Sequence, residues 1–256
     1  MSKLICEICG GVLKSTRDGT FICQSCGLEQ IPKQGKTLSG SLDESVQMCL
    51  AFGAITDGNY SKAVKLFGII LRKNNHETIA DLLQREDELK DCCRKAIAEE
   101  ISNMMDEMSV ASVETFFTLF SDALFVVDKV DTEARDILKL SVMNVLCNNV
   151  SRKLQVFQDI QLSEYGFHKL YTTALLVQII TEHIFDYEIP PIIKANYANC
   201  VINAMQLLLS NNDEKLVSDK WGAYRYVRRL DCKEIDSLNN IIHYYKNIVE
   251  VNDECS

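Results

Sequence analysis

Four cysteines near the N-terminus stand out by their spacing. Cys6 and Cys9 belong to one Cys-x₂-Cys-Gly motif, Cys23 and Cys26 belong to a second, and thirteen residues separate the two pairs. Two residues between cysteines let one tight turn direct both sulfurs at the same ion, and the following glycine can adopt a positive φ. Four thiolates complete the closed tetrahedral site that is typical of structural Zn²⁺. The sequence therefore predicts one structural zinc ion per chain.

The residues between the two pairs predict a small β-hairpin. Residues 13–17 and 20–23 form two short strand patterns around an Asp18-Gly19 turn. A segment this short has too small a core to fold without a staple, which the metal would supply. A rubredoxin-like iron site and a thioredoxin-type redox motif are the alternatives. Nothing else suggests electron transfer, and no βαβ pattern surrounds either pair.

The motif pair around the Asp-Gly hairpin resembles the zinc ribbons found at the start of many bacterial proteins. The resemblance covers residues 1–30 and is specific for the metal site. It implies no particular activity, because ribbons occur in enzymes, transcription factors and adaptors alike.

The composition changes near residue 40. Residues 1–40 contain six of the 11 glycines, a density typical of turns. Residues 31–40 contain a proline and two glycines and are expected to be a linker. The sequence thus predicts a ribbon over 1–30, a linker over 31–40 and a helical domain over 41–256.

Hydrophobic periodicity predicts helices through most of the remaining chain. The expected fold is mostly α, with a small N-terminal β zinc ribbon followed by an α-helical solenoid or an irregular bundle. Pro191 is expected in the first turn of a helix. The predicted helices cover residues 77–107, about 113–127, 134–146, 152–162, 167–187, 191–209, 213–229 and 233–250.

The segment 42–73 predicts a helical hairpin. Its Ala63-x₃-Phe67 element resembles the second half of a tetratricopeptide repeat. A ribbon followed by one such hairpin resembles a group of bacterial cytoplasmic proteins, which implies an adaptor-like role. An ordinary hairpin within a bundle is the alternative, because the segment departs from the repeat pattern at Gln47, Ala54 and Asn75.

The charge and the remaining reactive residues disfavour several function classes. The formal net charge of -9 argues against general attraction to nucleic acid or anionic lipid. The sequence predicts a cytoplasmic protein with neither a secretory signal nor a membrane span. No phosphate-binding loop or catalytic histidine spacing is present, so we expect no enzyme. Four further cysteines are interpreted as small, buried hydrophobic residues: Cys49, Cys147, Cys200 and Cys232.

One aromatic and basic segment could bind a partner. On the helix predicted over 213–229, four residues would share one face: Trp221, Tyr224, Arg225 and Arg228. Such residues anchor protein partners or stack on bases, although the aromatic residues could equally enter the core. The preferred hypothesis is a non-enzymatic protein-binding adaptor. The alternatives are a nucleic-acid or transcription-linked protein and an enzyme with a dispersed site.

The first prediction concerns the metal. Purified protein should contain one Zn²⁺ per chain, and Cys23→Ser should lose it, because three thiolates no longer close the tetrahedral site. Elemental analysis of protein dialysed against metal-free buffer measures both. Zinc that is absent from the wild type, or retained in the variant, would contradict the prediction.

Overall fold

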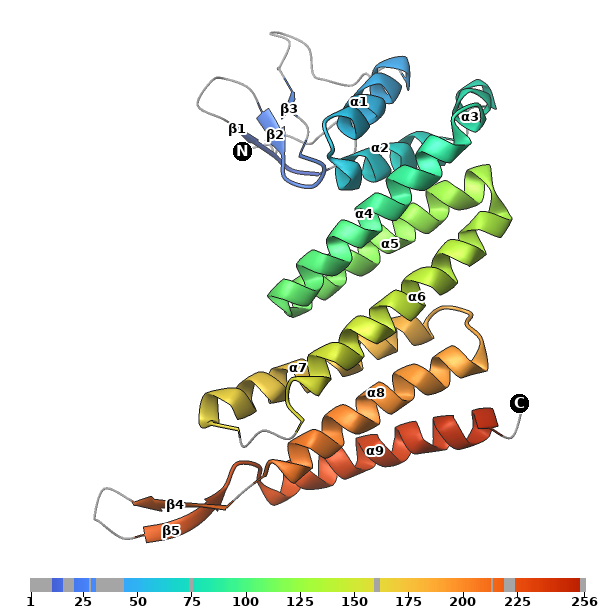
Figure 1. Cartoon of the computed structure of the whole chain (residues 1–256). Helices are drawn as coiled ribbons and strands as arrows, with labels where there is room; N and C mark the ends of the chain where they lie inside the picture. Colours follow the sequence, from blue (N-terminus) through green and yellow to red (C-terminus); the bar gives the residue numbers. More distant parts are fainter. Residues whose placement is uncertain are drawn as a thin grey trace. The chain divides into compact units, whose positions relative to one another are not determined.

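Figure 1 shows a computed structural model of the whole chain. The structure describes residues 11–15, 21–27, 29–30, 44–73, 76–158, 162–212, 214–218 and 224–253. Over these residues the chain is mostly helical, with two small antiparallel sheets, which confirms the predicted mostly α class. The described helices are α1 (Glu44–Thr56), α2 (Tyr60–Arg72), α3 (His76–Leu83), α4 (Glu86–Glu107), α5 (Val110–Val130), α6 (Thr132–Gln155), α7 (Glu164–Phe185), α8 (Pro191–Ser210) and α9 (Cys232–Asp253).

The chain divides into two compact units. Unit 1 comprises Met1–Asn103 and Thr115–Lys139, and unit 2 comprises Met104–Glu114 and Leu140–Ser256. The predicted linker over 31–40 lies outside the described residues. The ribbon, linker and helical-domain boundaries at residues 30 and 40 therefore stay predictions.

Unit 1 contains a three-stranded antiparallel sheet of very short strands. The strands β1 (Leu13–Ser15), β2 (Phe21–Cys23) and β3 (Glu29–Gln30) lie in that order, and Leu13 is opposite Cys23. The β1–β2 pairing confirms the two paired strands predicted between the cysteine pairs, and the predicted Asp18-Gly19 turn lies outside the described residues. Strands of two or three residues bury little apolar surface, so this sheet depends on other interactions for its stability.

Helices α1 and α2 form the hairpin that the sequence predicts over 42–73. Gly58, at φ +73°, supplies the left-handed turn between them. The side chain of Asn59 caps α2 by accepting a hydrogen bond from the Lys62 N–H at 3.2 Å. The single helix predicted over 77–107 is wrong, because the chain turns between α3 and α4. There the Arg85 N–H donates to the Leu82 carbonyl, which closes a tight turn and ends α3.

Aromatic stacking within α5 and an ion pair between α4 and the start of α6 stabilise unit 1. The buried rings of Phe116 and Phe120 on α5 are stacked, with centroids 5.7 Å apart. Lys90 on α4 pairs at 2.7 Å with Asp131, which precedes α6. The hydrogen bond from Lys90 lowers the pKa of Asp131, as does the Ala134 N–H that this carboxylate accepts as the cap of α6.

Helix α5 is also apolar enough to be tested as a membrane span. Among the described residues, Val110–Val130 is the helix whose length and composition would allow it to cross a bilayer. Of its apolar window, 56% is buried inside the structure. A central helix of a packed helical bundle can have the same length and composition, so this observation is weak evidence for a membrane span.

Unit 2 is organised around α8. Helix α7 packs on α8, α8 packs on α9, and the buried Tyr197 on α8 donates a 2.7 Å hydrogen bond to the Met143 carbonyl on α6. Pro191 occupies the first turn of α8, which confirms its predicted role as a helix start. Ser163 caps α7 by accepting a hydrogen bond from the Gly166 N–H at 3.1 Å.

Two helices predicted in unit 2 are wrong. No separate helix begins at residue 152, because α6 continues to Gln155 and a turn follows it. Leu154, at the end of α6, and Phe157, in the turn, are both buried. In place of a helix over 213–229, β4 (Glu214–Ser218) pairs antiparallel with β5 (Tyr224–Arg228). The β5 sequence contains two tyrosines and a valine, which favour a strand, and Gly222 stands between the two strands in the sequence.

The second prediction tests the core of unit 1. Phe116→Ala should lower the free energy of unfolding by about 3–5 kcal/mol, because it removes a fully buried ring from a stacked aromatic pair. Val110→Ala, at a half-exposed position on the same helix, should change it by less than about 0.5 kcal/mol. Urea denaturation followed by circular dichroism measures both. Equal effects of the two substitutions would contradict this description of the core.

Candidate functional site

The second cysteine pair lies at the end of β2 and in the turn that follows. Both Cys23 and Cys26 are buried, at 1% and 8% exposure. The Ser25 N–H points at the Cys23 Sγ at 3.4 Å, and the Gly27 N–H donates to the Cys23 carbonyl at 2.9 Å. Gly27 has φ +68°, a conformation that favours glycine. The turn therefore directs one backbone N–H, that of Ser25, at a buried sulfur, an arrangement that suits a thiolate bound to a metal.

Gly11, which follows the first cysteine pair, packs against the second pair. A Cβ added to Gly11 would lie 2.3 Å from the Ser25 Oγ and 3.0 Å from the Cys23 Sγ. The chain that follows the first Cys-x₂-Cys motif thus lies directly against the second. Such an approach suits four thiolates around one ion.

The structure describes half of the predicted ligand set. Cys6 and Cys9 lie outside the described residues. Among the described residues, no group of three or more His, Cys, Asp and Glu side chains could hold a metal ion. The features of Cys23 and Cys26 fit a zinc knuckle, and the complete four-cysteine site stays a prediction.

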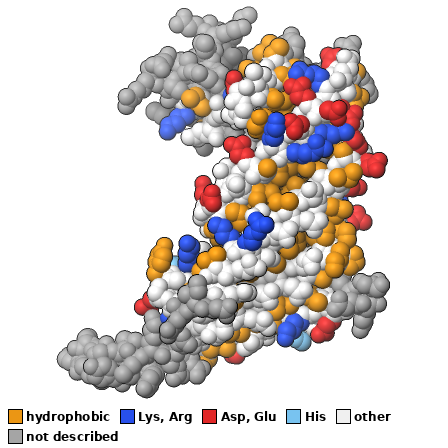
Figure 2. All heavy atoms as spheres, in the orientation of Figure 1, with side chains coloured by type: hydrophobic (Ala, Val, Ile, Leu, Met, Phe, Trp, Pro, Cys, Tyr) orange, Lys and Arg blue, Asp and Glu red, His pale blue; other side chains and the backbone are white. Residues whose placement is uncertain are grey.

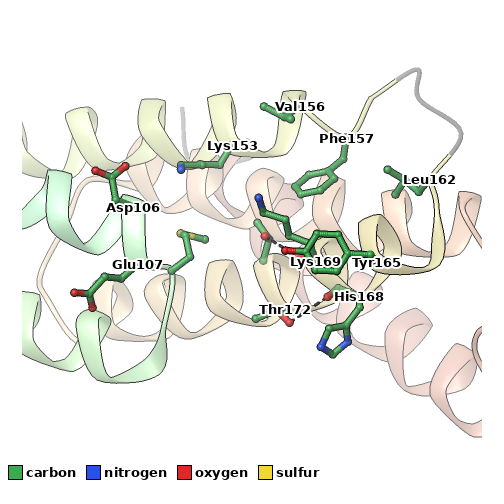
Figure 3. Close-up of a pocket in the computed structure, with 12 residues that line it drawn as sticks. Asp106, Glu107, Lys153, Val156, Phe157, Leu162, Tyr165, His168, Lys169 and Thr172 are labelled. Carbon is green, nitrogen blue, oxygen red and sulfur yellow. Dashed lines mark hydrogen bonds between the residues drawn. The ribbon is translucent and has the colours of Figure 1, made fainter.

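A second candidate site is an open groove of about 550 Å³ in unit 2, which we name the α6–α7 groove (Figure 3). The end of α4, the last turn of α6, the α6–α7 connection and the first half of α7 line it. Met108, at φ 45°, ends α4 beside the groove, and its N–H donates to the Met104 carbonyl. This left-handed residue terminates the helix and leaves the last turn of α4 as one wall.

The groove combines apolar contact surface with exposed apolar side chains. Phe157 and Leu162 are buried, whereas Val156 and Tyr165 are 63% and 77% exposed. Apolar lining exceeds polar lining in this groove. Large apolar side chains that are this exposed around a recess are a common feature of binding surfaces.

Charged side chains of both signs line the rest of the groove. Figure 3 shows Asp106 and Glu107 on one side, the apolar residues on the other, and Lys153 and Lys169 between them. The two acidic residues come from α4, and the lysines come from α6 and α7. The groove can therefore orient a ligand that carries both charges.

The hydroxyl groups of the groove serve the backbone of α7. The Thr172 hydroxyl donates to the His168 carbonyl at 3.1 Å, and the Thr173 hydroxyl donates to the Lys169 carbonyl at 2.8 Å. Neither hydroxyl proton is directed at a general base. These threonines are consequently arranged as parts of a helix and not as activated nucleophiles.

The structure corrects the helical geometry predicted for the partner-binding residues, and their binding of a partner stays a prediction. Trp221 lies outside the described residues, and Tyr224, Arg225 and Arg228 belong to β5. A face shared at a period of 3.6 residues does not exist in a strand, where neighbours are related by a period of two. The helical geometry predicted for Tyr224, Arg225 and Arg228 is therefore wrong.

Two of the cysteine interpretations are also corrected. Cys49 and Cys232 are exposed, Cys147 is half-buried and Cys200 is buried. Cys49 lies on an exposed side of α1, and Cys232 lies at the start of α9. Both of these small apolar side chains are therefore at the surface.

Sequence reasoning missed the groove, although part of its pattern is local. Five lining residues follow the i, i+3, i+4, i+7, i+8 spacing of one helix face, and this polar stripe interrupts an otherwise apolar segment. The sequence therefore shows this stripe, but it does not show which residues of α4 and α6 complete the groove. Its members are Tyr165, His168, Lys169, Thr172 and Thr173.

Comparisons with protein-family models, with curated proteins and with solved structures gave no match. The resemblances to zinc ribbons and tetratricopeptide hairpins stay predictions that rest on the residues themselves.

The third prediction tests the close approach at Gly11. Gly11→Ala should weaken zinc binding at least about tenfold, because the added methyl group collides with Ser25 and Cys23 and displaces the knuckle turn. Gly53→Ala, where an added Cβ meets nothing within 4 Å, should leave the affinity unchanged. Competition with a chromophoric chelator measures both dissociation constants. Unchanged affinity in Gly11→Ala would show that this approach does not support the metal site.

Proposed function

We propose that this protein is a non-catalytic adaptor in which a structural zinc ribbon accompanies helices that bind a segment of another protein in the α6–α7 groove. The observation that carries the proposal is the pair of exposed apolar side chains, Val156 and Tyr165, beside the buried Phe157 and Leu162. Protein interfaces combine an apolar centre with a polar rim, and tyrosine is among the residues that contribute most to binding energy.

The shape and charge of the groove favour a peptide segment over a small molecule. Small-molecule sites usually enclose most of the ligand, whereas this groove is only partly enclosed. A matching segment would place an aliphatic or aromatic side chain against Tyr165 and Phe157. A basic residue of that segment would face Asp106 and Glu107, and an acidic residue would face Lys153.

The charge distribution disfavours nucleic acid as the partner. The groove contains two acidic residues and two lysines, and the whole chain has a net charge of -9. Binding to a phosphate backbone requires an excess of basic groups. Figure 2 shows acidic, basic and hydrophobic side chains interspersed over the visible face of the described residues. Such a mixture suits contact with another protein better than contact with a phosphate backbone.

The zinc ion has a structural role in this proposal. Four cysteine thiolates fill the coordination sphere, which leaves no open position for water or substrate. Cys6, Cys9, Cys23 and Cys26 would hold the ion, and the ion would supply the stability that strands of two or three residues lack.

The fourth prediction tests the groove with peptides. Peptides selected from a random library against the full zinc-loaded chain should bind Tyr165→Ala at least about tenfold more weakly, because the substitution removes the exposed ring of the groove. Tyr244→Ala is the matched control, since Tyr244 is an exposed tyrosine on α9 that does not line the groove. Fluorescence polarisation measures both dissociation constants.

Two results would contradict the adaptor proposal. One is equal loss of peptide binding in the Tyr165 and Tyr244 variants, which would mean that the groove is not the binding surface. The other is binding of single-stranded nucleic acid that weakens steeply with salt and competes with the peptides, which would favour the nucleic-acid alternative.

A further inference from the structure

Helices α6 and α8 bring two cysteines of unit 2 into contact. The Cys147 Sγ and the Cys200 Sγ are 3.8 Å apart, although 53 residues separate them in the sequence. The Ser151 Oγ, one turn along α6 from Cys147, lies 3.4 Å from the Cys200 Sγ. Two thiols and a hydroxyl therefore form one small cluster between the helices.

We propose that Cys147 and Cys200 are a peroxide-reactive dithiol that closes to a disulfide between α6 and α8. The sulfurs already touch, and a bond requires them to approach to about 2.05 Å. The reaction needs a small oxidant, because Cys200 is only 5% exposed while Cys147 is half-buried. Hydrogen peroxide is the smallest oxidant of the required class. The dithiol is separate from the α6–α7 groove and does not depend on the adaptor proposal.

The hydrogen bonds of the cluster favour one reactive thiolate. The Cys200 sulfur lies 3.8 Å from the Cys147 sulfur and 3.4 Å from the Ser151 hydroxyl, and either atom of each pair could be the donor. With Cys147 and Ser151 as the donors, both hydrogen bonds lower the pKa of Cys200, which burial opposes. The hydrogen bond between the two thiols, together with burial, raises the pKa of Cys147. Cys200 is therefore the better nucleophile of the pair, and Cys147 keeps its proton until the second step.

The neighbouring Tyr197 does not compete with the two sulfurs for the proton that Cys147 keeps. Burial and the two nearby sulfurs raise the pKa of Tyr197. Its hydroxyl proton is directed at the Met143 carbonyl at 2.7 Å. Tyr197 therefore stays protonated and forms a fixed wall beside the dithiol.

The two chemical steps balance. The Cys200 thiolate attacks one oxygen of hydrogen peroxide, so that an S–O bond forms, the O–O bond breaks and hydroxide leaves to take up a proton as water. The Cys147 sulfur then attacks the Cys200 sulfenic acid. An S–S bond forms, the S–O bond breaks, and the displaced hydroxide leaves as water with the Cys147 proton. Both sulfurs are oxidised, and one peroxide is reduced to two waters.

The vicinal pair Cys92 and Cys93 provides an internal comparison. Both are buried on α4, burial raises the pKa of Cys92 to about 12, and burial likewise raises the pKa of Cys93. The Cys92 thiol is directed at the Tyr60 carbonyl at 3.8 Å. These thiols stay protonated and should react far more slowly than Cys200.

Peptide mapping of the full zinc-loaded chain tests the proposal. The protein is treated with a small excess of hydrogen peroxide, denatured in N-ethylmaleimide and digested with trypsin. We expect residues 140–152 and 195–215 to be recovered as one linked species, two hydrogen atoms lighter than the sum of the reduced peptides. Ser151→Ala should slow its formation by about threefold, because the Cys200 thiolate loses a hydrogen bond. Cys49→Ser should leave the rate unchanged, since Cys49 is exposed on α1.

Three outcomes would overturn the proposal. One is recovery of both peptides as separate maleimide adducts under conditions that oxidise the exposed cysteines. Another is conversion of Cys200 to sulfinic or sulfonic acid without any linked species. The third is oxidation of Cys92 or Cys93 at the same rate as Cys200. Each is read on the wild-type chain, so that a poorly folded variant does not obscure the result.

Discussion

Unit 2 depends on the burial of α8. Ten of its side chains are buried, and each large apolar side chain removed from water contributes about 1.5–3 kcal/mol. A helix buried on so many sides needs neighbours on each of them, and α6, α7 and α9 supply those faces. The position of α7 follows from this packing, because its apolar residues are buried while its polar stripe, except for Thr173, stays exposed. The α6–α7 groove is thus a consequence of how α8 is covered.

The predicted ribbon differs from unit 2 because it has little apolar surface to bury. Its strands are two or three residues long, so the hydrophobic effect that organises unit 2 has little to act on there. In the proposed ribbon a metal ion would replace a core, because bonds to thiolates contribute directly to the free energy of folding. The tight packing of Gly11 against Cys23 and the positive φ of Gly27 are the local costs of bringing sulfurs together.

Helix α6 contributes residues to both candidate sites of unit 2, the dithiol and the α6–α7 groove. Its middle supplies Cys147 and Ser151 to the buried cluster against α8, and its last turn supplies Lys153 to the groove. The side toward α8 holds two thiols in contact. The exposed side carries the charges and apolar surface that the proposed partner would contact. The same helix can serve both because residues about three or four apart share a face, while those between them point elsewhere.

The sequence by itself determined the local features of this protein. Helical periodicity placed most of the helices, Pro191 marked the start of α8, and the spacing of Cys6, Cys9, Cys23 and Cys26 predicted a metal site whose second half has the expected turn. These features depend on residues within a few positions of one another. Their energetics are therefore visible in a short window of sequence.

Only the tertiary structure decided the remaining features. The strands at 214–218 and 224–228 are stabilised by pairing with each other, which a helical pattern in Tyr224–Arg228 concealed. The groove assembles side chains from α4, α6 and α7, and the thiols of Cys147 and Cys200 meet across 53 residues. Such contacts depend on which faces pack together. That choice is made by the burial of the whole set of helices and not by any one segment.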